Sequence, residues 1–136
     1  KELAEIDVER VSATPEEMAE LVASCHVGLS ICRDDSGVSL LAAMPTKIGE
    51  FLASGRPVII NPGLVDAAEL IGSDNCGVVF GSSVSGRLEE AANLLERQLD
   101  DPHLPDRCRK LAETHFDLDG GVDQLVTTYY SVKGSP

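Results

Sequence analysis

The sequence predicts an α/β fold in which a parallel sheet of about four strands is flanked by helices. Short runs rich in Val, Ile and Leu alternate with longer stretches whose apolar residues recur at helical spacing. Hydrophobic residues make up 43% of the chain and aromatic residues only 4%, so aliphatic side chains must fill the core, as in helix-covered parallel sheets. The alternation implies right-handed crossovers and helices on both faces, which is the doubly wound, Rossmann-like arrangement.

The first predicted elements are a short strand over residues 6–11 and a helix that starts at Thr14. Thr14, Pro15 and Glu17 provide an N-cap, a first-turn proline and a capping-box acid. The apolar residues of this helix recur at i, i+3, i+4 and i+7 and should face the sheet: Met18, Leu21, Val22 and Cys25.

Buried strands and helices alternate over the next part of the chain. One helix opens at Pro45, presents Ile48, Phe51 and Leu52 as its apolar face, and stops at Gly55. A shorter helix follows the turn at residues 61–63 and ends near residue 72. The strands between these helices are predicted over 27–32, 57–60 and 76–80.

Three further helices are predicted, from about residue 84 onward. The second of them should start at Asp106. The apolar sets of the first and third are Leu88, Ala92, Leu95 and Leu99, and then Val122, Leu125, Val126 and Tyr129. No internal repeat appears, so residues 1–136 form one domain; we expect it to be a partial one, because Lys1 directly precedes a strand-like stretch.

Composition excludes several classes of function. The net charge of −12 opposes an extended nucleic-acid surface, although backbone N–H groups and a few basic side chains can still hold a single nucleotide. The cysteines and histidines stand apart without metal-ligand spacing, which predicts buried, reduced thiols and no metal. No apolar run approaches the roughly 20 residues of a membrane span, so we expect a cytoplasmic domain.

Two loops are candidates for the site, because ligands of such sheets bind beyond the carboxyl ends of the strands. They cover residues 33–44 and 61–66, and the helix from Pro45 lies between them. Its free N–H groups and dipole attract an anion. Lys47 and Glu50 share an outward face, where one can meet phosphate and the other ribose hydroxyls. On spacing alone, a simple surface ion pair between the two side chains is the favoured explanation.

Residues 44–59 read MPTKIGEFLASGRPVI. This stretch resembles, without a gap, the donor-site helix and following strand of GT-B glycosyltransferases, especially glycosyltransferase family 4. The resemblance extends upstream through residues 27–30, downstream from Asn61 to Phe80, and more loosely along the C-terminal helices, so it covers most of the chain. It implies the C-terminal, donor-binding half of a GT-B enzyme.

The resemblance also implies roles for single residues. Glu50 would hold the nucleotide ribose, and Arg33 would face the phosphates with help from Lys47. The loop 61–66 would lie near the diphosphate and the sugar. Arg33 could instead pair with Asp34 or Asp35 in solvent. The donor-binding set is then Arg33, Pro45, Thr46, Lys47, Glu50, Gly63, Leu64, Val65 and Asp66.

Two residues of the second loop can also be explained by structural roles that involve no ligand. Asp66 could be the N-cap of the helix that follows, and Gly63 could be a turn glycine. The chain also departs from the family's E-x7-E pattern, because Ala42 stands where the first Glu would be. That departure puts the contact with the donor sugar in doubt.

The function that follows is transfer of a glycosyl group from a nucleoside diphosphate sugar, such as a UDP- or GDP-sugar, without a metal or another cofactor. The resemblance implies retention of configuration and an acceptor bound by an N-terminal domain, so the chain alone should be inactive. In relatives the last helix packs on that domain, and its exposed apolar side predicts self-association. The alternatives are half of a sugar-nucleotide epimerase and a non-catalytic Rossmann-like binding module.

Overall fold

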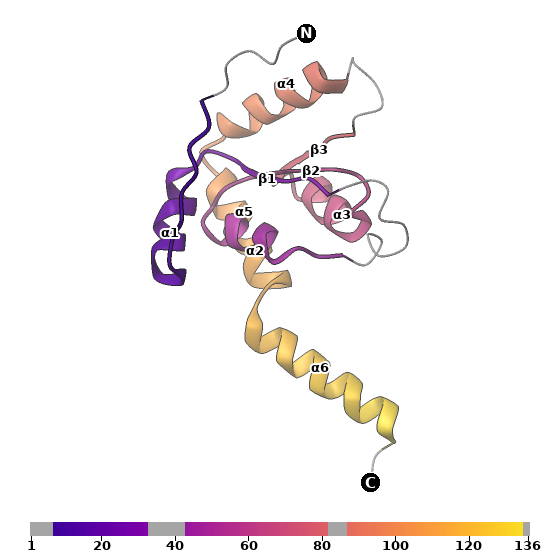
Figure 1. The fold of residues 1–136 in the computed structure, drawn as a ribbon. Helices are drawn as coiled ribbons and strands as arrows, with labels where there is room; N and C mark the ends of the chain where they lie inside the picture. The colour runs from indigo at the N-terminus through magenta and orange to yellow at the C-terminus, as the bar shows by residue number, and fades with distance from the viewer. Residues whose placement is uncertain (1–6, 33–42, 82–86, 135–136) are drawn as a thin grey trace.

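The computed structural model describes residues 7–32, 43–81 and 87–134, and it is an α/β fold built on an open parallel sheet (Figure 1). Three strands make up the sheet in this part of the chain, in the order β1-β2-β3. They are β1 (Gly28–Ser30), β2 (Val58–Ile60) and β3 (Gly77–Val79). Each lies inside a strand predicted from the sequence.

The predicted strand over residues 6–11 is wrong in its described part. Residues 7–11 form neither strand nor helix, and Val8 and Val11 are exposed. A strand needs a hydrogen-bonded neighbour, and the segment has none in the described sheet.

Six helices accompany the described strands. They are α1 (Pro15–Ser24), α2 (Thr46–Ala53), α3 (Val65–Ser73), α4 (Arg87–Leu99), α5 (Leu104–His115) and α6 (Leu118–Lys133). Helix α5 begins at Leu104 instead of Asp106, because Pro105 occupies its first turn. None of the described helices is both long and apolar enough to cross a bilayer.

The start of α1 confirms the predicted capping box. The Glu17 amide donates to Thr14 Oγ1 at 3.4 Å, and the Thr14 amide donates to Glu17 Oε2 at 2.9 Å. At the other end of α1, the Arg56 guanidinium donates to the carbonyl of Ala23. The loop before β2 therefore holds the end of a helix that has no basic residue in its own last turn.

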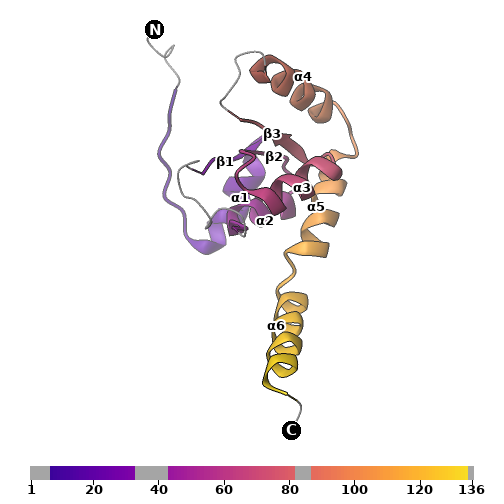
Figure 2. The ribbon, with the colours of Figure 1, turned by 90° about the vertical axis from the view of Figure 1, so that its right-hand side faces the viewer.

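One face of the sheet carries the core. Val58 and Ile60 of β2 point toward α2 and α3, and they are fully buried with Ile48 and Leu52 of α2. Helix α5 packs against α2 and lies beside it in Figure 2. These contacts hold α2 against this face of the sheet.

Helices lie on both faces of the sheet, as predicted, but within the described ranges the opposite face is covered only in part. Leu29, Ile59 and Val78 lie in register across this face. Val78 is 4% exposed under α4, but Leu29 at the other end of the row is 65% exposed. Helix α4 contacts β3 and lies on the far side of the sheet from α2 and α3 (Figure 2). A single helix is too narrow to shield the whole sheet.

Helix α6 stands apart from the rest. It extends away from the sheet and its covering helices in both ribbon views (Figures 1 and 2), and none of its residues is buried. Its predicted helical pattern is confirmed.

Candidate functional site

The carboxyl edge of the sheet is where two helices begin. Chain direction places the start of α2 after β1 and the start of α3 directly after β2, so both helix N-termini lie at this edge. Pro45 is the N-cap of α2 and Leu64 that of α3, and neither cap makes a side-chain hydrogen bond. By contrast, Thr14 and Asp117 cap α1 and α6. The first-turn N–H groups of α2 and α3 therefore receive no hydrogen bond from an N-cap side chain, although the Ile48 amide donates to the Pro45 carbonyl at 3.0 Å.

Helix α2 presents Lys47 and Glu50 to solvent. Ile48 and Leu52 are completely buried and fix the helix against the sheet, whereas Lys47 and Glu50 are exposed. This confirms that the two side chains point outward from an anchored helix. No ion pair joins them in the described part of the chain, so the surface-pair reading is not the one that the structure adopts.

Glu50 lies between two grooves. The first, of ≈ 510 Å³, separates α2 from α5 and is bordered by Thr46 and Glu50 on one side and by Glu113 and Phe116 on the other. The second, of ≈ 520 Å³, runs between α1 and α2, past Pro15 and Met18. Thr46 lines the first groove and is exposed.

The loop after β2 is organised by Asn61, which the sequence analysis placed in the candidate loop 61–66 without a role of its own. Asn61 is 4% exposed, and its Oδ1 accepts a hydrogen bond from the Cys32 amide at 2.9 Å. The bond ties the end of β1 to the end of β2. A polar residue directly after a buried strand was the available signal, but its partner is 29 residues away in sequence.

The predicted site residues of this loop do not all face solvent. Leu64 is fully buried in the core, so only its backbone can serve a ligand. Val65 and Asp66 are exposed, and Gly63 is half-buried.

The reading of Asp66 as the N-cap of α3 is wrong. The N-cap of α3 is Leu64. Asp66 lies in the first turn, where its negative charge interacts favourably with the helix dipole.

Two positions named in the sequence analysis, Arg33 and Ala42, lie outside the described residues. Pro45, by contrast, is half-buried at the very start of α2. The structure therefore brings Pro45, Thr46, Lys47 and Glu50 together on one helix end.

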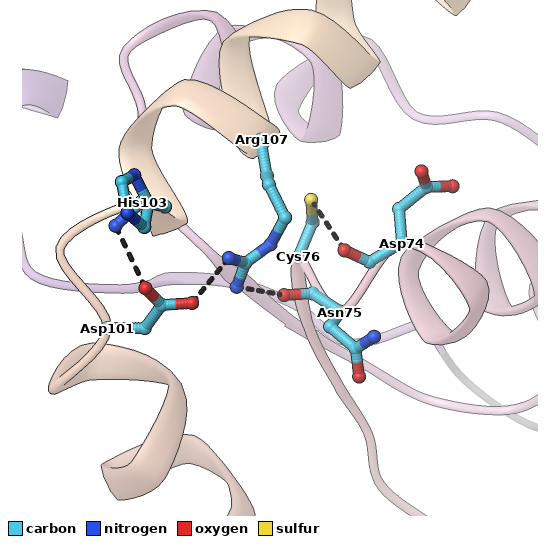
Figure 3. A network of polar contacts seen from close by, with 6 residues as sticks. All are labelled: Asp74, Asn75, Cys76, Asp101, His103 and Arg107. Carbon is cyan, nitrogen blue, oxygen red and sulfur yellow. Dashed lines mark hydrogen bonds and ion pairs between the residues drawn. The ribbon is translucent and has the colours of Figure 1, made fainter.

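A polar network at the other edge of the sheet is separate from this site (Figure 3). Arg107 of α5 pairs with Asp101, and it also donates to the carbonyl of Asn75 at 3.4 Å. The His103 amide donates to Asp101 Oδ1 at 2.9 Å, and this bond and Arg107 lower the pKa of the Asp101 carboxyl. The network joins the start of β3 to the loop between α4 and α5, which is a structural role.

Metal ligation has no visible basis in the described ranges, where no group of three or more His, Cys, Asp or Glu side chains could hold an ion. At the carboxyl edge, helix N–H groups, one ammonium and one carboxylate are available to recognise a ligand. No protein-family model, curated protein or solved structure matches the chain.

Proposed function

We propose that this chain binds the nucleoside diphosphate of a sugar-nucleotide donor and serves as the donor half of a GT-B glycosyltransferase of the family 4 type. One observation carries the proposal: Lys47 and Glu50 stand exposed on the first turns of a helix that Ile48 and Leu52 anchor under the carboxyl edge of the sheet. The resemblance of residues 44–59 to the donor-site helix points to the same residues.

Each group has a distinct part in binding. The Glu50 carboxylate accepts hydrogen bonds from two neighbouring ribose hydroxyls, which requires an ionised, exposed side chain. The phosphates lie toward the helix N-termini, because the N-caps of α2 and α3 leave first-turn N–H groups without a side-chain acceptor. Lys47 adds a mobile positive charge to this end of α2.

The same groups would stabilise the leaving group. During transfer, the bond between the sugar's anomeric carbon and the diphosphate oxygen breaks, and its electron pair stays on the diphosphate. N–H dipoles and Lys47 favour that growing charge more than they favour the intact donor. The new bond forms to an acceptor oxygen, which the resemblance assigns to another domain.

Isothermal titration with UDP and GDP tests the proposal. We expect binding of at least one, weakened about tenfold by Glu50→Ala because two hydrogen bonds to the ribose are lost, and weakened also by Lys47→Ala. Matched controls are Glu69→Ala and Lys110→Ala, which remove the same charges from exposed positions of α3 and α5. Equal binding by all four variants, or no binding of either nucleotide, would reject the assignment.

A further inference from the structure

A hollow of ≈ 360 Å³ lies where α4 and α5 meet the start of β3. It is at the amino edge of the sheet, opposite the edge that carries the candidate nucleotide site. Its border is polar throughout and comes from α4, α5 and the loops between elements: Asn75, Arg97, Gln98, Asp101 and Arg107. The hollow therefore shares no residue with the nucleotide site.

Gln98 of α4 places an unpaired oxygen at this hollow. The residue is 6% exposed, and its Nε2 donates to the Gly77 carbonyl at 3.1 Å, which fixes the orientation of the side chain. The Gln98 Oε1 atom is buried and has no hydrogen-bond partner. A buried amide oxygen without a donor costs free energy, so Gln98 favours a ligand that can donate a hydrogen bond.

Arg107 of α5 offers the complementary group. Figure 3 shows its guanidinium between the Asp101 carboxylate and the Asn75 carbonyl, and its two terminal nitrogens donate to these groups. The Arg107 Nε atom is buried and has no hydrogen-bond partner. The guanidinium is thus held in place while one N–H group remains for an acceptor on a ligand.

The charges around the hollow select one kind of anion. Arg97 is exposed and forms no ion pair within the described ranges, so it adds a second positive charge beside Arg107. Asp101 stays ionised at neutral pH, because the His103 amide and Arg107 lower its pKa. Oxygens without a proton suit the two arginines but are repelled by the Asp101 carboxylate and the Gln98 oxygen. An oxyanion that keeps one proton satisfies both kinds of group.

We propose that this hollow binds inorganic phosphate in the form of hydrogen phosphate. The P–OH group donates to Gln98 Oε1 or to the Asp101 carboxylate, and the other phosphate oxygens accept from the two arginines. Sulfate has the same shape but carries no proton at neutral pH, so the hollow should discriminate against it. The proposal does not depend on the nucleotide site, which lies at the other edge of the sheet.

A titration of the isotope-labelled chain with sodium phosphate, followed by amide chemical shifts, tests the proposal. We expect saturable shifts at Asn75, Gly77 and Asp101, and about tenfold weaker binding of sodium sulfate at equal ionic strength. Shifts at Thr46 and Lys47 alone would assign the phosphate to the nucleotide site and overturn the proposal. Equal affinity for sulfate, or no shift near the hollow, would also overturn it.

Two variants test the groups that make the hollow selective. Arg97→Ala should weaken phosphate binding about tenfold, because a charge-assisted hydrogen bond is lost. The matched control Arg109→Ala removes the same charge from an exposed position of α5 outside the hollow and should leave the affinity unchanged. Asp101→Asn replaces the repelling carboxylate by an amide that can donate, so the preference for phosphate over sulfate should shrink. Equal losses in the two arginine variants, or an unchanged preference in Asp101→Asn, would contradict the site.

Methyl phosphate distinguishes inorganic phosphate from a phosphate ester as the ligand. Well above its second pKa of about 6, the ester carries no proton, whereas inorganic phosphate still carries one. We therefore expect methyl phosphate to bind about as weakly as sulfate in that pH range. Binding as tight as that of inorganic phosphate would show that the proton has no part in recognition, and the proposal would fail.

Discussion

The ring of Phe116 occupies the place where a side chain on Gly49 would begin. A β-carbon built on Gly49 would lie 2.6 Å from Phe116 Cδ1, well inside van der Waals contact. Phe116 is the C-cap of α5, and Gly49 immediately precedes Glu50 on α2. This contact therefore sets the position of the helix that carries the candidate site.

Gly49→Ala should destabilise the fold by about 1–3 kcal/mol, because the new methyl group displaces the Phe116 ring. Urea unfolding followed by circular dichroism gives the free energy of unfolding. The matched control is Gly72→Ala in α3, where nothing lies within 4 Å of the new β-carbon. The control should be neutral or stabilising by up to about 1 kcal/mol, since alanine favours a helix. Equal effects at both positions would contradict the close contact.

Arg56→Ala should loosen the end of α1. The guanidinium donates to the Ala23 carbonyl, so its removal leaves a helix terminus without that partner. We expect a loss of about 1–2 kcal/mol in the free energy of unfolding, together with faster amide exchange in the last turn of α1. Arg97→Ala, at an exposed position of α4, is the control and should leave both measurements unchanged.

The Asp101 carboxylate should make stability depend on pH in the acid range. Its pKa is lowered from the ordinary 3.8, first by the His103 amide and then by Arg107. A depressed pKa means that the ionised form favours the folded chain, so this contribution is present above pH 3.8 and is lost as the pH falls through the lower, folded-state value. As the pH falls below about 4, the urea concentration at the unfolding midpoint should therefore decrease less steeply for Asp101→Asn than for the wild type.

The control for this titration is Asp100→Asn, which removes the neighbouring exposed carboxylate. Its midpoints should follow the wild-type curve. Because Asp101 is close to solvent, added salt should reduce the difference between the wild type and Asp101→Asn. Identical curves for all three proteins would show that the network of Figure 3 does not hold the carboxylate ionised.

The cysteines should react in two classes. Cys76 and Cys108 are completely buried, and the hydrogen bond with Cys76 and burial raise the pKa of the Cys108 thiol. Cys25 and Cys32 are half-buried. A short pulse of N-ethylmaleimide read by mass spectrometry should label Cys25 and Cys32 first, and the other pair only after urea is added. Labelling of all four thiols at one rate would contradict the buried pair.

Local sequence signals predicted most elements because their physical causes are local. Thr14 and Glu17 are three residues apart, and Gly55 takes a φ of +74° directly after α2. Such caps operate within one turn of chain, so they can be recognised without knowing the fold. The outward direction of Lys47 and Glu50 was predictable for the same reason, since helical spacing alone separates them from Ile48.

Other predictions failed or were incomplete where the cause is distant in sequence. Aspartate is a common N-cap residue, which is why Asp66 was predicted to cap α3. The path of the chain instead makes Leu64 the N-cap, and the Leu64 side chain is buried. The role of Asn61 depends on Cys32, on a different strand. Asn61 and Cys32 are 29 residues apart, so no short stretch of sequence contains both partners of this hydrogen bond.

The sequence by itself determined most of the helices and strands, the capping box of α1 and the helical apolar spacing of α6, because each depends on residues within a few positions of one another. Only the tertiary structure decided that α4 covers β3 on the sheet face opposite α2 and α3, that Phe116 fits against Gly49, and that helix α6 buries none of its residues. These outcomes depend on which surfaces reach one another after the chain has crossed the sheet. Burial is a property of the assembled layers, and hydrophobic spacing specifies a face without naming its partner.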